Sequence, residues 1–357
     1  MVAAIFKLFG VYAVSAAIAI YFVNSVLSAF TCALLYWLAK PVFGHAVGLA
    51  SSVLFAVYPA AVWHSINTIW NTSLMGCAMV LLIGLLMRLP FCSYGHVLAT
   101  GVLMGFILLI DPSPAFFYPF ALGLCLWIQR GQPHAIRNVA TLAILTALVF
   151  GPWMLRNYLV LGVFTPRCCP GLELKLGNNE TSWRLRTTGH AASGMHPGTS
   201  DTELAVFLRI GEVAYNRRCM SQAIQFIREN PGKFFKLSGS RFLSWWFGQA
   251  TDWKGHIQTG FSLAPLKRVA SLLSAVFFII GAAAALKLKR SVHMILLLLL
   301  VFPAPYYFVH VSERYRFPTE PFLVVLAAEG LLVMLRWIGI WKGDPTSLLS
   351  KITPAVR

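Results

Sequence analysis

Long apolar runs constrain this chain more than any other feature. The sequence is 58% hydrophobic and only 11% charged, whereas soluble domains carry about 25% charged residues. A helix that crosses a membrane needs about 20 apolar residues. Candidate segments of about this size cover residues 12–39, 45–63, 72–88, 94–110, 114–129, 136–155, 268–286, 291–309 and 319–339. We therefore expect an all-α polytopic membrane protein with about nine transmembrane helices.

One polar segment, residues 156–266, interrupts this pattern and is far longer than a usual connection between helices. We expect an N-terminal transmembrane bundle in residues 1–155, an extracytoplasmic loop segment in 156–266, and C-terminal transmembrane helices with a short cytoplasmic tail in 267–357. Local signals predict amphipathic helices inside the loop segment. Ser200-Asp201-Thr202-Glu203 is a capping box that starts a helix, and Asn230-Pro231 ends one helix and begins another.

Basic residues predict the orientation of the chain. Short loops that are rich in Lys and Arg face the cytoplasm. One such set holds Lys40, Arg88, Arg130, Arg137, Lys287, Lys289, Arg290 and Arg336. The long segment and the turn at residues 310–318 then face outward. Cations and aromatics are mixed between Lys233 and Trp246, which is typical of a helix that lies in the membrane interface.

The formal net charge of +17 does not indicate a nucleic-acid partner. The basic residues are scattered through loops, and no compact soluble domain is present that could hold a duplex. Anionic membrane lipid or a phosphorylated ligand fits this distribution of charge better.

The stretch from Val309 to Pro321 concentrates functional side chains between two apolar runs. It holds two arginines, Arg314 and Arg316, together with a histidine, a tyrosine and two glutamates. Pro318 and Pro321 are expected to stiffen a short turn and to oppose helix formation across it. Guanidinium forks match phosphate oxygens geometrically, so lipid-linked phosphate is one candidate ligand. The alternative is a loop that only anchors the chain at the membrane surface.

Three groups of motifs occur in a fixed order along the chain. The first is Gly151-Pro152-Trp153-Met154-Leu155-Arg156-Asn157-Tyr158, followed by Gly162–Pro166 and Gly177-Asn178-Asn179. The second is Gly211–Tyr215, then Phe226–Pro231, then Arg241-Phe242. The third is Arg314-Tyr315-Arg316-Phe317-Pro318 with Pro321. This set resembles bacterial polyprenyl-phosphate-sugar-dependent membrane glycosyltransferases of the GT-C type, glycosyltransferase family 39-like. They are relatives of the protein O-mannosyltransferases and the lipid A aminoarabinose transferases.

The resemblance extends from about Phe9 to Ala328 and implies an enzyme of the bacterial inner membrane. Such enzymes transfer a sugar from a polyprenyl phosphate to an acceptor hydroxyl at the outer face. The implied donor-phosphate ligands are Arg314, Arg316 and Arg156, because cations stabilise the anionic leaving group. The candidate substrate contacts are His310, Tyr315 and His64. The resemblance leaves open which sugar is carried and whether the acceptor is a glycan, a lipid or a protein.

The chain departs from the family in its acidic residues. The family places an acid in the first outward loop, whereas no Asp or Glu precedes Asp111 here. The hypothesis is that the initial helix and the catalytic loop are absent, through a truncated gene model or a degenerate copy. Asp111 and Glu313 are weak substitutes. Asp111 fits a turn with its prolines, Glu313 fits an ion pair with the neighbouring arginines, and Glu329 lies in an apolar run without an evident partner.

Two other classes of function remain open. If the catalytic loop is lost, a non-catalytic protein that binds lipid phosphates is the consequence. A transporter is the second alternative, although transporters usually carry paired broken helices and buried charges near the membrane midplane. No HxxE, HExxH or CxxC spacing predicts a metal site, and a requirement for a divalent metal is left open.

Overall fold

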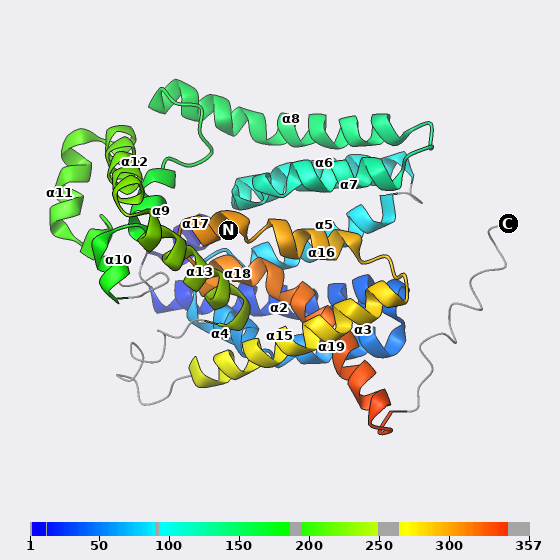
Figure 1. The fold of residues 1–357 in the computed structure, drawn as a ribbon. Coiled ribbons are helices and arrows are strands. Elements are labelled where there is room, and N and C mark those ends of the chain that lie inside the picture. The colour runs from blue at the N-terminus through cyan, green and yellow to red at the C-terminus, as the bar shows by residue number, and fades with distance from the viewer. Residues whose placement is uncertain (1, 12, 90–92, 186–193, 249–263, 342–357) are drawn as a thin grey trace. The chain divides into compact units, whose positions relative to one another are not determined.

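The computed structural model describes residues 2–11, 13–89, 93–185, 194–248 and 264–341. Within these residues the chain forms α-helices, short 3-10 helices and turns, with no strand (Figure 1). The all-α expectation is confirmed for this part of the protein. Cys92 and the predicted cytoplasmic tail after residue 341 lie outside the described residues.

Each of the nine apolar runs contains at least one helix, but most of these helices are short. The helices of the apolar runs are α2 (Val14–Phe43), α3 (His45–Ala56), α4 (Pro59–Asn67), α5 (Thr72–Arg88), α6 (Tyr94–Ile110), α7 (Tyr118–Ile128), α8 (Ala135–Leu161), α15 (Ala264–Lys287), α16 (His293–Val301), α17 (Ala304–Phe308) and α19 (Glu320–Trp337). The helices α1 (Val2–Phe9), α9 (Pro170–Gly177), α10 (Glu180–Leu185), α11 (Asp201–Ile210), α12 (Glu212–Glu229), α13 (Pro231–Phe247) and α18 (Glu313–Arg316) complete the set, with the 3-10 turns η2 (Ser113–Phe116) and η5 (Phe317–Thr319).

Four helical stretches are long and apolar enough to cross a membrane: Val14–Phe43, Ala135–Leu161, Pro265–Lys287 and Glu313–Trp337. A fifth span results if α3 and α4, which meet at a bend of 46°, are counted as one. The protein therefore has four or five helices that can span a membrane among its described residues, and the predicted nine are not confirmed. Proline explains part of the difference, because Pro59 opens α4 and Pro303 separates α16 from α17.

The turn predicted at residues 310–318 is helical instead. Residues 313–316 form α18, residues 317–319 form η5, and α19 follows directly. The expectation that proline would oppose helix here was wrong. Pro321 occupies the first turn of α19, where the backbone N–H has no partner in the helix and its loss costs little.

The chain divides into two compact units. Unit 1 comprises residues 1–92, 269–299 and 317–357, and unit 2 comprises residues 93–268 and 300–316. These units differ from the three consecutive segments expected from the sequence, because residues 93–155 cluster with the long polar segment rather than with the N-terminal residues.

Unit 1 is built around α19, which is largely buried. Close helix packing requires glycine here, since a side chain at Gly330 would collide with the carbonyl of Phe277 in α15. Glu329 of α19 is fully buried, and its Oε1 lies 3.3 Å from Nη2 of Arg290. The sequence placed Arg290 in a cytoplasmic loop and saw no partner for Glu329. The structure turns the Arg290 side chain inward, where it also donates to the carbonyl of Val42.

Unit 2 holds α6, α7, α8 and the helices of the polar segment. Helix α8 continues to Leu161, six residues past the predicted end at 155, with Pro152 inside it. The predicted helix starts in the polar segment are confirmed. Ser200 Oγ accepts a hydrogen bond from the backbone N of Glu203 at the start of α11, and α13 begins at Pro231 directly after Asn230. Helix α9 lies beside α12 (Figure 1).

Candidate functional site

The short helix α9 carries the central acid of the candidate site. Pro170 opens the helix at its first turn, and Gly171 fits closely against α12. The backbone N of Gly171 donates to Asn216 Oδ1 at 2.7 Å, and a side chain at this position would collide with the Asn216 carbonyl. Only glycine permits this approach, so the orientation of Glu173, two residues later, is set by the packing of α9 on α12.

The other end of α9 is fixed to the segment that precedes His310. Gly177 abuts the carbonyl of Val309 so closely that any side chain would collide with it. Asn178 Nδ2 donates to the carbonyl of Phe308 at 2.9 Å. These contacts hold α9 against residues 308 and 309, and they bring Glu173 next to His310.

Arg241 of α13 stabilises the contact between α9 and residues 308 and 309. Its side chain is fully buried and donates to the Gly177 carbonyl, to Asn178 Oδ1 at 3.2 Å and to the Phe308 carbonyl at 3.2 Å. Burial lowers the pKa of Arg241 to about 10, so the guanidinium stays charged at neutral pH. Arg241 belongs to the second group of sequence motifs. Its hydrogen bonds to backbone carbonyls stabilise the contact between α9 and residues 308 and 309.

Three side chains, those of His310, Tyr315 and Arg314, lie around Glu173. The Glu173 Oε2 lies 3.3 Å from His310 Nδ1 and accepts a hydrogen bond of 3.4 Å from the Tyr315 hydroxyl. The Tyr315 hydroxyl in turn accepts from Arg314 Nη2 at 2.7 Å. Burial raises the pKa of Glu173, although the charge of Arg314 and the hydrogen bond from Tyr315 oppose the shift. We call Glu173, His310, Arg314 and Tyr315 the α9 cluster.

Stacked rings support the α9 cluster from one side. The Arg314 guanidinium lies 4.7 Å from the centroid of the Tyr315 ring. Tyr315 stacks on Tyr306 at 5.0 Å, and Tyr306 stacks on Trp245 at 5.3 Å. Trp245 is almost fully buried in α13. The stack therefore connects a rigid core residue to the partly exposed Arg314 and limits the freedom of both Tyr315 and Arg314.

Asp111, one of the two acids proposed from sequence, lies near the α9 cluster. Its Oδ1 accepts from the backbone N of Ser113 at 2.9 Å, as expected of a turn residue. Its Oδ2 also lies 3.7 Å from Nη1 of Arg167. The charge of Asp111 contributes to the raised pKa of Glu173, so the two carboxylates act on each other within unit 2.

The remaining predicted residues lie elsewhere. Glu313 pairs with Lys267, with Nζ 2.6 Å from Oε2. Arg316 is only 5% exposed. Arg156 is exposed on α8, where it contacts Asn157 and Trp153 of its own helix. His64 belongs to unit 1, is buried, and meets the ring of Phe317 edge-on. The structure thus joins three predicted residues, Arg314, Tyr315 and His310.

Sequence reasoning missed Glu173. Its position, between the Arg156 motif and Gly177-Asn178-Asn179, was a weak signal, because a single acid on a short polar helix is common. The partner that reveals it, Tyr315, is 142 residues away in the chain. No local pattern links the two, and only the packing of α9 brings them together.

Metal binding finds no support among the side chains that the structure describes. No group of three or more His, Cys, Asp or Glu residues within those ranges could hold a metal ion. The three cysteines of the polar segment, Cys168, Cys169 and Cys219, are free thiols. Burial raises the pKa of Cys169 to about 11, so this thiol is not an activated nucleophile at neutral pH.

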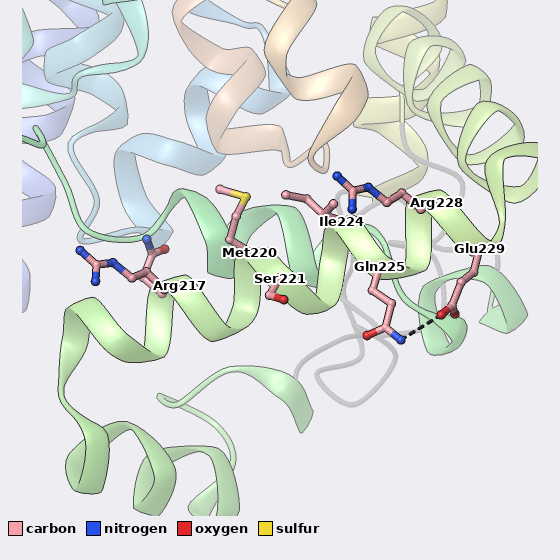
Figure 2. A pocket seen from close by; sticks show the side chains of 8 residues that line it. Arg217, Met220, Ser221, Ile224, Gln225, Arg228 and Glu229 are labelled. Carbon is pink, nitrogen blue, oxygen red and sulfur yellow. Dashed lines mark hydrogen bonds between the residues drawn. The ribbon is translucent and has the colours of Figure 1, made fainter.

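A separate hollow of about 600 Å³ runs along α12. Figure 2 shows Arg217 at one end and Arg228 near the other, with Met220 and Ile224 between them. Gln225 donates to Glu229 at 2.8 Å beside it. All the described lining residues belong to one helix, and no buried acid or histidine is among them. In this hollow, therefore, polar side chains from different elements do not come together as they do in the α9 cluster.

Comparisons of the chain with protein-family models, with curated proteins and with solved structures found no match.

Proposed function

We propose that this protein is a membrane glycosyltransferase that uses a polyprenyl-phosphate-linked sugar as its donor. The observation that carries the proposal is the position of Arg314, which is partly exposed, braced by Tyr315 and next to a partly buried acid. A guanidinium held in this way matches the geometry of phosphate oxygens with its planar set of N–H donors. The helices long enough to cross a membrane and the order of the sequence motifs support a lipid-borne donor.

The proposed chemistry assigns a distinct task to Arg314. When the sugar leaves the donor, negative charge develops on the polyprenyl phosphate. A fixed cation stabilises this charge more than it stabilises the bound donor, and it thereby lowers the barrier. The orientation that we propose places the polar segment of unit 2 on the outer side of a bacterial inner membrane, where the lipid-linked donor is presented.

The test measures binding of polyprenyl phosphate to the full chain in lipid nanodiscs. We expect R314A to weaken binding at least tenfold, because a hydrogen bond to a charged group contributes about 1.5–3 kcal/mol. R314K should be intermediate, since lysine keeps the charge but not the planar fork. R184A is the control, because Arg184 is an exposed arginine of α10 that pairs with Glu180.

Unchanged binding by R314A overturns the proposed donor site. Binding of polyprenyl phosphate by the wild type without any sugar transfer favours the non-catalytic alternative. Uptake of a labelled solute into proteoliposomes without sugar transfer favours the transporter. R316A is measured together with its thermal unfolding, because the burial of Arg316 makes a folding defect the first effect to exclude.

A further inference from the structure

We infer that Glu173 is the general base that takes the proton from the acceptor hydroxyl, with His310 as its proton-sharing partner. This inference rests on the proposed glycosyltransferase function, and it assigns the one role that the sequence left without a residue. A general base must reach the acceptor, must ionise near the working pH and must be held in place. The position and surroundings of Glu173 meet these requirements.

The position of Glu173 satisfies the requirement for reach. The side chain is 26% exposed, and its Oε2 contacts His310 and Tyr315. Only one phenol separates the carboxyl group from Arg314, the proposed ligand of the leaving phosphate. An acceptor hydroxyl at Glu173 is therefore close to a sugar whose phosphate is bound by Arg314.

The surroundings of Glu173 suit a base more than a structural ion pair. In the described residues no Lys or Arg forms an ion pair with this carboxylate, which contacts a histidine and a phenol. The ionisable groups that face it are His310, Tyr315, Arg314, Tyr306, Cys169, Asp111 and Arg167. Burial and Asp111 raise its pKa, which moves a carboxylate toward the range in which it accepts a proton effectively.

The two competing acids lack this combination. Asp111 is engaged by the backbone of Ser113 and by Arg167. Glu313 forms an ion pair of 2.6 Å with Lys267, and a neighbouring cation keeps a carboxylate ionised but makes it a weaker base. Of these three acids, Glu173 alone combines burial with a histidine that can share the proton.

The transfer step balances without any further reagent. The acceptor oxygen forms a bond to the anomeric carbon of the sugar, while its proton passes to Oε2 of Glu173. The bond from the anomeric carbon to the phosphate oxygen breaks, and its electron pair goes to the polyprenyl phosphate beside Arg314. When neutral with Nδ1 unprotonated, His310 can share the proton that Glu173 has received, which returns the carboxylate for the next cycle.

The experiment measures release of labelled hexose from polyprenyl-phosphate-linked glucose, galactose or mannose, with water as the smallest acceptor. The full-length protein in nanodiscs is compared with E173Q, D111N and E313Q. We expect E173Q to lose at least about a hundredfold in rate, the usual contribution of a general base, while polyprenyl phosphate binding is retained. The exposed Glu180 of α10 supplies the control E180Q, which should match the wild type.

The pH profile separates a base from a residue that only supports the fold. A base works when deprotonated, so the wild-type rate should fall in acid with a midpoint above the ordinary carboxyl value of 4.5. E173D keeps a carboxylate at a greater distance and should retain this acid limb at a lower rate, even if E173Q folds poorly. The residual rate of E173Q should show no such limb.

Several outcomes overturn the inference. They are a normal rate in E173Q, loss of the acid limb in D111N or E313Q instead, and absence of hexose release from a wild type that binds polyprenyl phosphate. Loss of the donor site is a different result, because it appears as failure of wild-type binding or as unchanged binding in R314A. The two proposals can therefore fail separately.

Discussion

Two carboxylates in unit 2 have similar exposure but opposite electrostatic environments. Glu173 is 26% exposed and Glu203 is 22% exposed. Glu203 receives hydrogen bonds from the Tyr215 hydroxyl and from Lys175 Nζ at 3.1 Å. Burial alone raises the pKa of Glu203, but these two hydrogen bonds and the charge of Lys175 outweigh it and lower the pKa. Glu173 accepts a hydrogen bond from a phenol and contacts His310, and burial raises its pKa.

The comparison is informative because α9 serves both sites. Glu173 and Lys175 are two residues apart, which separates them by about 200° around the helix. One side of α9 therefore faces Tyr315 and His310, while the other supplies the cation for Glu203. The two shifts have different causes: burial raises the pKa of Glu173, whereas the hydrogen bonds from Tyr215 and Lys175 and the charge of Lys175 lower the pKa of Glu203.

The largest effect should come from Arg241, because it holds the end of the helix that both sites share. R241M removes hydrogen bonds from a buried cation to the Gly177 and Phe308 carbonyls, and it should destabilise unit 2 by about 3 kcal/mol. The midpoint of thermal unfolding of the full chain checks this prediction. R184M, at an exposed arginine, is the matched control. If the two variants lower the midpoint of thermal unfolding equally, Arg241 has no special structural role.

Removal of the cation should turn Glu203 into a carboxylate like Glu173. K175M leaves the acid of a partly buried pair without its ammonium, and we expect a loss of about 2 kcal/mol at neutral pH. The double variant K175M/E203L should recover part of this loss, because it removes the unpaired charge as well. Chemical unfolding of the single and double variants measures the coupling, and simple additivity would contradict it.

Neutralising each acid should have opposite effects on stability. Glu203 has a lowered pKa, so its contribution is present above 4.5 and is lost as the pH falls through its lower folded value. E203Q should therefore destabilise by about 1–2 kcal/mol at neutral pH, and the difference should disappear in acid. Unfolding curves measured between pH 3 and pH 8 test this dependence.

Glu173 has the reverse sign. Because its folded pKa is raised, the folded state binds the proton more tightly, and stability declines as the pH rises from 4.5 through the folded value. E173Q should consequently be as stable as the wild type at neutral pH, or more stable, while E203Q is less stable. If E173Q is less stable than the wild type at neutral pH, and its stability varies with pH as that of the wild type does, Glu173 is a structural acid.

Loss of either phenol should cost less stability than loss of Arg241 or Lys175. Y215F removes a hydrogen bond to a charged carboxylate and should cost about 1.5 kcal/mol. Y315F removes a hydrogen bond of 3.4 Å, which is long and weak, and should cost about 0.5 kcal/mol. Thermal unfolding ranks the two variants. Equal losses would contradict the difference between the two sites.

Local interactions were predictable from the sequence. The predicted boundaries of residues 72–88 and 94–110 agree with α5 and α6, because apolar runs bounded by polar residues and proline need no distant information. The capping box at Ser200 and the junction at Asn230-Pro231 behave in the same way. Arg314, Tyr315 and His310 could be named as site candidates because they are close together in the chain.

The tertiary structure alone decided which partner each charge has. Glu173 meets Tyr315 across 142 residues, Glu313 pairs with Lys267 across 46, and Glu329 pairs with Arg290 rather than lying alone. A charge in a sequence predicts attraction but not the identity of its partner, because that depends on how helices pack. Close contacts at Gly171 and Gly177 fix α9, and this packing turns an inconspicuous glutamate into the centre of the candidate site.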